Sequence, residues 1–157
     1  MNYKDIDRVF SRLQSVGFAH RQRAENDSRV WFDSVDHTVA VGFLDLYATI
    51  QCDIYLKAQP ELVIDAYSAI VYFNRATLVR FFQENLAPST EVLANFICDE
   101  LVGRSSQVFA VRDSKGWRQL VDVHARSMKC RNRAFWMRAS GHADGVLGSV
   151  ASGPVAF

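Results

Sequence analysis

The clearest structural signal in the chain lies in residues 46–57, which read LYATIQCDIYLK. Apolar side chains take every even position of this stretch, and polar side chains or tyrosines take every odd position. Successive side chains of a strand point to opposite faces of a sheet, so a period of two held over this length predicts a half-buried β-strand. The even-numbered face is predicted to pack on a core, and the odd-numbered face to contact solvent.

Two further segments, residues 30–32 and 38–44, precede this strand and are predicted to be its neighbours. The first is a short apolar run, and the second alternates apolar and polar positions, with Gly42 marking a predicted β-bulge. The polar residues 20–28 are predicted to form a loop. Strands that follow one another with short connections favour antiparallel pairing, so we expect an antiparallel meander.

Helical periodicity lies on both sides of the predicted sheet. Residues 3–16 carry apolar side chains at helical spacing, with Asn2 as a cap and Gly17 in the left-handed position that ends the helix. Residues 89–103 carry a second such pattern, from a serine or threonine cap to a closing glycine. These elements predict an α+β fold, an antiparallel meander sheet with helices packed on one face. Over the first half of the chain, the order of elements is similar to that of small secretion-chaperone domains, which implies no particular site residue.

The segments that follow the predicted sheet fit more than one structure. Residues 60–71 fit a helix that opens at Pro60, but their β-branched side chains also fit a strand. Asn74 is the predicted cap of a further helix, which ends before Pro88.

The last third of the chain is predicted to be mainly β-structure. Residues 113–116, Asp-Ser-Lys-Gly, have the composition of a hairpin loop. Residues 117–126 alternate apolar and polar side chains, which favours a strand, although their apolar positions also fit a helical period. Residues 133–139 are predicted to add one more strand.

Length and composition indicate a single domain. The chain has 157 residues, of which 49% are hydrophobic and 22% charged, as in ordinary globular proteins. We expect one α+β domain over residues 1–140, followed by a tail over residues 141–157 that is rich in Gly, Ala and Ser.

The sequence predicts no signal peptide and no membrane span. The N-terminus is charged without a following apolar run, and the longest uncharged apolar stretch, residues 66–73, is far shorter than the ~20 residues that span a bilayer. Cys52, Cys98 and Cys130 are widely spaced and form no C-x-x-C motif. We therefore expect reduced thiols, a cytoplasmic location and no membrane partner.

Charge is unevenly distributed along the chain. Residues 103–142 carry nine basic and two acidic side chains, a net +7, whereas residues 1–102 carry nine basic and fourteen acidic ones, a net −5. Such asymmetry indicates how a protein meets its partners, not how it folds. It is also consistent with a homo-oligomer, in which the acidic part of one copy meets the basic part of another.

The basic segment, residues 104–138, is the predicted binding site for an acidic partner. A protein partner is our first hypothesis. Nucleic acid is the alternative, since cations neutralise phosphates and aromatic rings stack on bases. A solvated surface without a partner also fits the composition. The predicted contact residues are Arg112, Lys115, Trp117, Arg118, Arg126, Lys129, Arg131, Arg133, Trp136 and Arg138.

The solvent-facing side of the strand at 46–57 is a second predicted surface. It carries Tyr47, Gln51 and Tyr55, and tyrosine is enriched at protein interfaces. Pairing between neighbouring strands explains the same residues without a partner.

Enzyme signatures are absent, so we expect a binding protein rather than an enzyme. The sequence holds no Gly-rich phosphate loop, no Gly-x-Ser-x-Gly and no His-Glu-x-x-His, and its histidines show no ligand spacing that predicts a metal. No cofactor is expected. Two weaker hypotheses remain: a reactive thiol at Cys130, between two cations, or a nuclease-like set of Asp99, Asp113 and Lys115.

Overall fold

The computed structural model describes residues 2–22, 27–44 and 49–139, with side chains described for residues 2–22, 27–43 and 50–129. The predicted tail, residues 141–157, lies outside these ranges. A five-stranded antiparallel sheet has the order β1 (Ala19–Arg21), β2 (Arg29–Asp33), β3 (His37–Leu44), β4 (Thr49–Leu56) and β5 (Gln59–Asp65). The helices are α1 (Tyr3–Phe10), η1 (Ser11–Val16), α2 (Ala66–Glu84), α3 (Thr90–Val102), η3 (Arg104–Ala110) and α4 (Ser114–Ala139).

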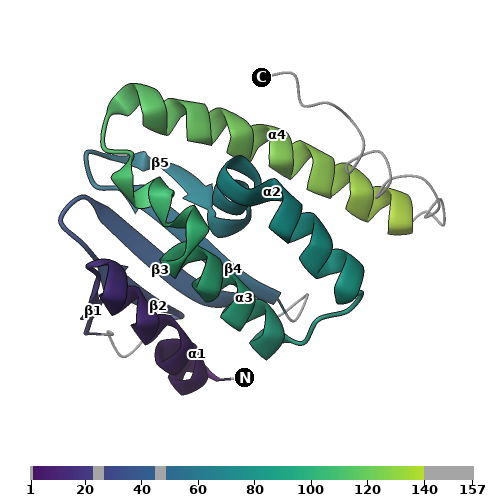
Figure 1. The fold of residues 1–157 in the computed structure, drawn as a ribbon, viewed down its shortest axis with the longest axis horizontal. Coiled ribbons are helices and arrows are strands. Elements are labelled where there is room, and N and C mark those ends of the chain that lie inside the picture. Colours follow the sequence, from purple (N-terminus) through teal and green to yellow (C-terminus); the bar gives the residue numbers. More distant parts are fainter. Residues whose placement is uncertain (1, 23–26, 45–48, 140–157) are drawn as a thin grey trace.

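The helices lie on one face of the sheet, which confirms the predicted α+β fold (Figure 1). α1 packs on β2 and β3, α3 packs on β4, and α4 runs along β5 (Figure 1). Two side-chain pairs, Cys52 opposite Val41 and Ile54 opposite Val39, are buried beneath the helices. The even-numbered face of β4 therefore forms part of the core, as its period predicted.

The caps predicted at Asn2, Gly17, Ser89 and Gly103 are confirmed. Asn2 Oδ1 accepts hydrogen bonds from the backbone N–H groups of Lys4 and Asp5, at 2.9 and 3.1 Å, and the Asp5 carboxylate accepts from the Asn2 N–H at 2.8 Å. Gly17 follows η1 with a φ of +91°, in the left-handed region that glycine occupies at low cost. α3 begins after Ser89, whose side chain accepts from the Val92 N–H, and Gly103 caps its end.

Gly42 lies in a regular part of the sheet, so the predicted bulge there is wrong. It pairs with Arg29 of β2 and Gln51 of β4 without a shift in register, and the register shift in the sheet lies between Tyr55 and Leu56. A Cβ atom at Gly42 would lie 3.1 Å from Cγ of Arg29. The missing side chain therefore leaves space for Arg29 to cross β3.

The segments around the sheet correct three predictions. β1 overlaps residues 20–28, which were predicted to be a loop, at His20 and Arg21. Residues 59–65 form β5, and the helix begins only at Ala66, after Asp65 has capped it. Asn74 has non-helical angles (φ −152°, ψ 49°) and marks a kink within α2, not the start of a separate helix. The kink brings the rings of Tyr67 and Phe82 to a centroid distance of 6.5 Å, although a straight helix would separate them by about 22 Å.

The predicted strands at 117–126 and 133–139 are wrong, because both segments belong to α4. Asp113, predicted in a hairpin loop, instead begins this helix: its Oδ1 accepts from the Gly116 N–H at 2.8 Å. That bond lowers the pKa of the Asp113 carboxyl. Neither α4 nor another helix in the described part of the chain is long and apolar enough to cross a membrane.

His37 joins the sheet to the segment that precedes α4. Its side chain is buried between Phe109 and Trp117, and its Nε2 lies 3.0 Å from the Val111 carbonyl oxygen, to which it donates in the neutral tautomer. Burial lowers the pKa of His37 from its ordinary value of 6.5. Just below pH 6.5, the His37 ring therefore remains neutral in the folded protein, whereas the same ring in the unfolded chain has begun to bind a proton.

We expect the free energy of unfolding to fall as the pH drops below about 6.5, toward the lowered pKa of His37 in the folded state. Above about pH 6.5, this contribution to the free energy of unfolding should be fully present. His37→Gln keeps an N–H donor but does not titrate, so its stability should vary less over this window. Urea midpoints at about pH 7.5 and about pH 5.5 measure the difference. Equal pH dependence in the two proteins would contradict the assignment.

Candidate functional site

The outer face of α4 carries a line of cations. Trp117, Leu120 and Val123 point into the core, and the opposite side of the helix is exposed. An α-helix turns by about 100° per residue, so the residues three, eleven and fourteen positions after Lys115 lie close to one line along its surface. This line spans about 21 Å. We call this set the α4 basic stripe, and it consists of Lys115, Arg118, Arg126 and Lys129.

The α4 basic stripe lacks the carboxylate partners that other cations have. Among the described residues, no carboxylate lies within 4.0 Å of its charged groups. Three scattered cations, Lys4, Arg80 and Arg104, share this property, but each belongs to a different helix. The basic side chains that do have such a partner are Arg8, Arg12, Arg21, Arg29, Lys57 and Arg112.

Two of the predicted contact residues are held elsewhere. Arg112 precedes α4 and pairs with Asp36 at 3.0 Å. Trp117 is a core residue: it is 0% exposed, and its indole N–H donates to the Leu62 carbonyl oxygen at 2.8 Å. A buried ring offers no surface to a ligand, so Trp117 is corrected from a binding residue to a structural one.

The remaining predicted contacts lie toward the end of α4. Their backbones continue the helix, and their side chains lie outside the described part of the chain. They are Arg131, Arg133, Trp136 and Arg138.

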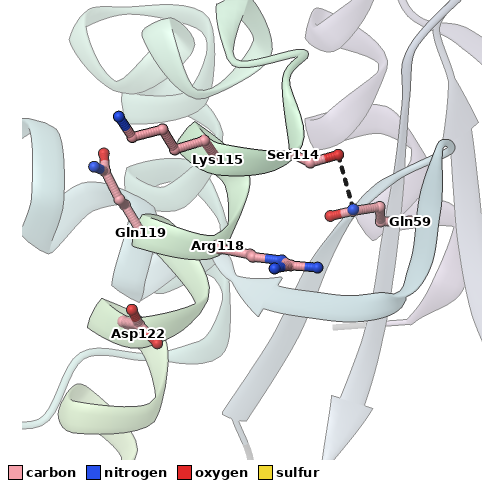
Figure 2. A pocket seen from close by; sticks show the side chains of 6 residues that line it. All are labelled: Gln59, Ser114, Lys115, Arg118, Gln119 and Asp122. Atoms are coloured by element: carbon pink, nitrogen blue, oxygen red, sulfur yellow. Dashed lines mark hydrogen bonds between the residues drawn. The ribbon is translucent and has the colours of Figure 1, made fainter.

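A recess of about 460 Å³ lies at the N-terminal end of the stripe, where α4 passes β5. Figure 2 shows Arg118 directed toward the strand, with Lys115 and Gln119 on the other side of the helix. The Gln59 side-chain amide donates to Ser114 Oγ at 2.8 Å, so the serine hydroxyl keeps its own hydrogen for another acceptor. Asp122 completes the lining.

The second predicted surface lies on the sheet face opposite the helices. Gln51 and Tyr55 are both on this face, whereas Tyr47 lies outside the described residues. Gln51 Nε2 donates to Asp53 at 2.9 Å, and the ring of Tyr55 lies 6.2 Å from that of Trp31, across the central strand. A partner for this face stays a prediction.

Ion pairs within this sheet face neutralise its charges. Arg29 crosses above Gly42 and donates to Asp53 at 2.7 Å. Arg21 binds both carboxylate oxygens of Asp33, at 2.6 and 2.8 Å, which lowers the pKa of that carboxyl. Burial raises the pKa of Asp53, since Arg29 offsets only part of the lost hydration. Among the described residues of this face, Asp33 and Asp53 therefore each have a cation partner.

A serine, a histidine and an aspartate meet where α2 begins, and sequence reasoning missed this cluster because they are far apart in the chain. Ser68 Oγ and Asp65 Oδ1 lie 3.0 and 3.5 Å from the same nitrogen, Nδ1 of His124. A Ser-His-Asp triad needs the serine and the carboxylate on opposite ring nitrogens. Ser68 is also 1% exposed and donates to Asp65 at 2.6 Å. The cluster caps α2 and holds it against α4.

Asp99 and Asp113, the two acids of the nuclease-like set, contact different partners. Asp99 pairs with Arg12, whereas Asp113 caps α4. Cys52 and Cys98 are buried, and burial raises the pKa of Cys98 to about 11. The Cys130 side chain lies outside the described residues. Among those that are described, no group of three or more His, Cys, Asp or Glu side chains could hold a metal ion.

The α4 basic stripe is therefore the described surface with the most distinctive chemistry. It combines outward cations, a concave end and hydrogen-bond donors, and it lies on a helix whose opposite side is fixed in the core. Searches of protein-family models, of curated proteins and of solved structures find no match to this chain.

Proposed function

We propose that the chain is a non-enzymatic binding protein whose α4 basic stripe contacts an acidic surface of a protein partner. The observation behind this proposal is the line of exposed cations that have no carboxylate within 4.0 Å among the described residues. Charges of one sign in a line raise the local potential, which steers an oppositely charged surface into contact and fixes its register.

Two features favour a protein surface over nucleic acid. Proteins that bind single strands stack bases on exposed aromatic rings, and Trp117, the one Phe, Tyr or Trp of α4 whose side chain is described, is buried. Asp122 lies in the line of cations between Arg118 and Arg126, where it would repel an evenly charged phosphate backbone. Nucleic acid is therefore an alternative outcome of the test.

Charge reversal of the stripe tests the proposal. We expect the Arg118→Glu, Arg126→Glu variant to retain about tenfold less of its partner than the unmodified protein, because each reversal replaces an attraction with a repulsion. The measurement is capture from native lysate on immobilised protein, with and without nuclease. The Lys4→Glu, Arg80→Glu variant changes net charge equally at two scattered cations and should capture as the unmodified protein does.

Each result has a definite meaning. A nuclease-resistant protein that the stripe variant loses and the control variant keeps supports the proposal. Release of all captured material by nuclease would assign the stripe to nucleic acid. Equal capture by the stripe variant and the control variant would rule the stripe out as a binding surface.

A further inference from the structure

The α4 basic stripe is not uniform along its length. Lys115 and Arg118 line the recess beside β5, whereas Arg126 and Lys129 do not. We infer that the recess is the anchor of the interface, in which a carboxylate of the acidic partner binds Arg118 and Ser114, with Lys115 adding to the positive potential from the other side of the helix. This inference rests on the proposed function and names the part of the stripe that determines affinity.

One pair of polar groups in the recess is held in place before a partner binds. Gln59 of β5 donates to Ser114 Oγ, which fixes the serine with its hydroxyl hydrogen free, and Figure 2 shows Arg118 reaching toward the same strand. An incoming carboxylate can then accept from Ser114 and from Arg118. Groups that are already oriented lose less conformational entropy on binding, so each contact contributes more to affinity.

The other end of the stripe lacks these features. Arg126 Nε donates to the backbone oxygen of Asp122, one turn back on the same helix, at 3.3 Å. Lys129 lies at the end of the stripe farther from the recess. Exposed ion pairs of this kind contribute little, because solvent screens them and both side chains must be ordered.

A carboxylate matches the charge of the recess. Lys115 and Arg118 carry two positive charges and Asp122 one negative charge, so the lining has a formal net charge of +1. A carboxylate carries one negative charge, whereas a phosphate monoester carries close to two at neutral pH. We therefore assign a side-chain carboxylate of Asp or Glu as the occupant, with phosphoserine as the ligand to compare it with.

Matched pairs of truncations test the anchor. The probes are a fluorescein-labelled oligoglutamate peptide and a phosphoserine peptide of equal net charge, with binding followed by fluorescence anisotropy. The first double variant combines Lys115→Ala with Arg118→Ala, and the second combines Arg126→Ala with Lys129→Ala. Each removes two charges from the same helix face. We expect the first variant to weaken oligoglutamate binding about tenfold and the second less than about threefold. Circular dichroism verifies that both variants remain folded.

The outcomes separate the anchor from the proposed function. Equal losses in the two variants, or a larger loss at Arg126 and Lys129, would overturn the anchor and leave the stripe as the binding surface. No loss in either variant would overturn both. Tighter binding of the phosphoserine peptide would overturn the assignment to a carboxylate. Two results together would establish Lys115 and Arg118 as the anchor end of the stripe. The first variant must lose more affinity than the second, and oligoglutamate must bind more tightly than the phosphoserine peptide.

Discussion

Trp117→Ala is expected to lower the free energy of unfolding by about 3–5 kcal/mol, the usual cost of emptying a large aromatic site in a core. Trp117 is among the largest fully buried side chains of the described chain. Its ring packs 5.6 Å from that of His37, and its indole N–H binds the carbonyl oxygen of Leu62 in β5. It therefore attaches α4 to the sheet, and urea unfolding followed by circular dichroism measures the loss.

A second substitution at the same position separates packing from hydrogen bonding. Trp117→Phe keeps an aromatic ring but leaves the Leu62 carbonyl oxygen without its donor, which costs about 1–3 kcal/mol for a buried group. Gln119→Ala, on the exposed side of α4, is the control and should change stability by less than about 0.5 kcal/mol. A Trp117→Ala protein as stable as this control would show that α4 does not depend on this contact.

The sequence predicted those elements in which local chemistry and burial agree. The strict alternation of residues 50–56 has one explanation, since a strand alone places Ile50, Cys52, Ile54 and Leu56 on the same face. The helix at the N-terminus has both an apolar stripe and matching caps, at Asn2 and Gly17. In these segments the propensity of each residue agrees with the tertiary structure, so a single sequence was sufficient.

α4 was missed because its sequence satisfies two periods. Asp113 to Gly116 suits a hairpin loop, yet the same aspartate suits a helix N-terminus, where its side chain accepts a backbone N–H. Residues 117–126 likewise alternate and also repeat at helical spacing. What favours the helix is contact with distant segments, such as Trp117 with Leu62 and His124 with Asp65, which no local pattern contains.

The candidate site was predictable in composition but not in geometry. Charge counting identified the basic segment, and its cations other than Arg104 and Arg112 lie on α4. Only the structure shows that Trp117 points inward, that Arg112 is already paired with Asp36, and that Lys115 and Arg118 share a recess with Gln59. A helical wheel of the alternative helix would have separated Trp117 from the exposed cations, since they lie on opposite sides.

The second large effect is expected at Arg29, whose removal leaves Asp53 as a nearly buried carboxylate without a cation. Asp53 is 8% exposed, and Arg29 donates to it at 2.7 Å. We expect Arg29→Met to lower the free energy of unfolding by about 2 kcal/mol, since the methionine keeps most of the packing volume but not the charge. The Gln51 amide still donates to Asp53, which limits the loss.

The pH dependence of this variant tests the cause. Burial already raises the pKa of Asp53, and loss of Arg29 raises it further. A carboxyl whose pKa is raised in the folded state stabilises the fold below its unfolded pKa of 3.8, and this stabilisation is lost as the pH rises through the folded pKa. The destabilisation of Arg29→Met should therefore shrink between about pH 7 and about pH 4.5.

A matched double variant separates the charge from the packing. Asp53→Asn removes the negative charge but keeps the shape and one acceptor oxygen, so adding it to Arg29→Met should restore part of the lost stability at neutral pH. Restored stability would show that the uncompensated charge of Asp53, and not the missing Arg29 side chain, destabilised the Arg29→Met protein. If the double variant is instead less stable than Arg29→Met alone at every pH, the ion pair over Gly42 is not what stabilises this face of the sheet, and the conformation of Arg29 must have another cause.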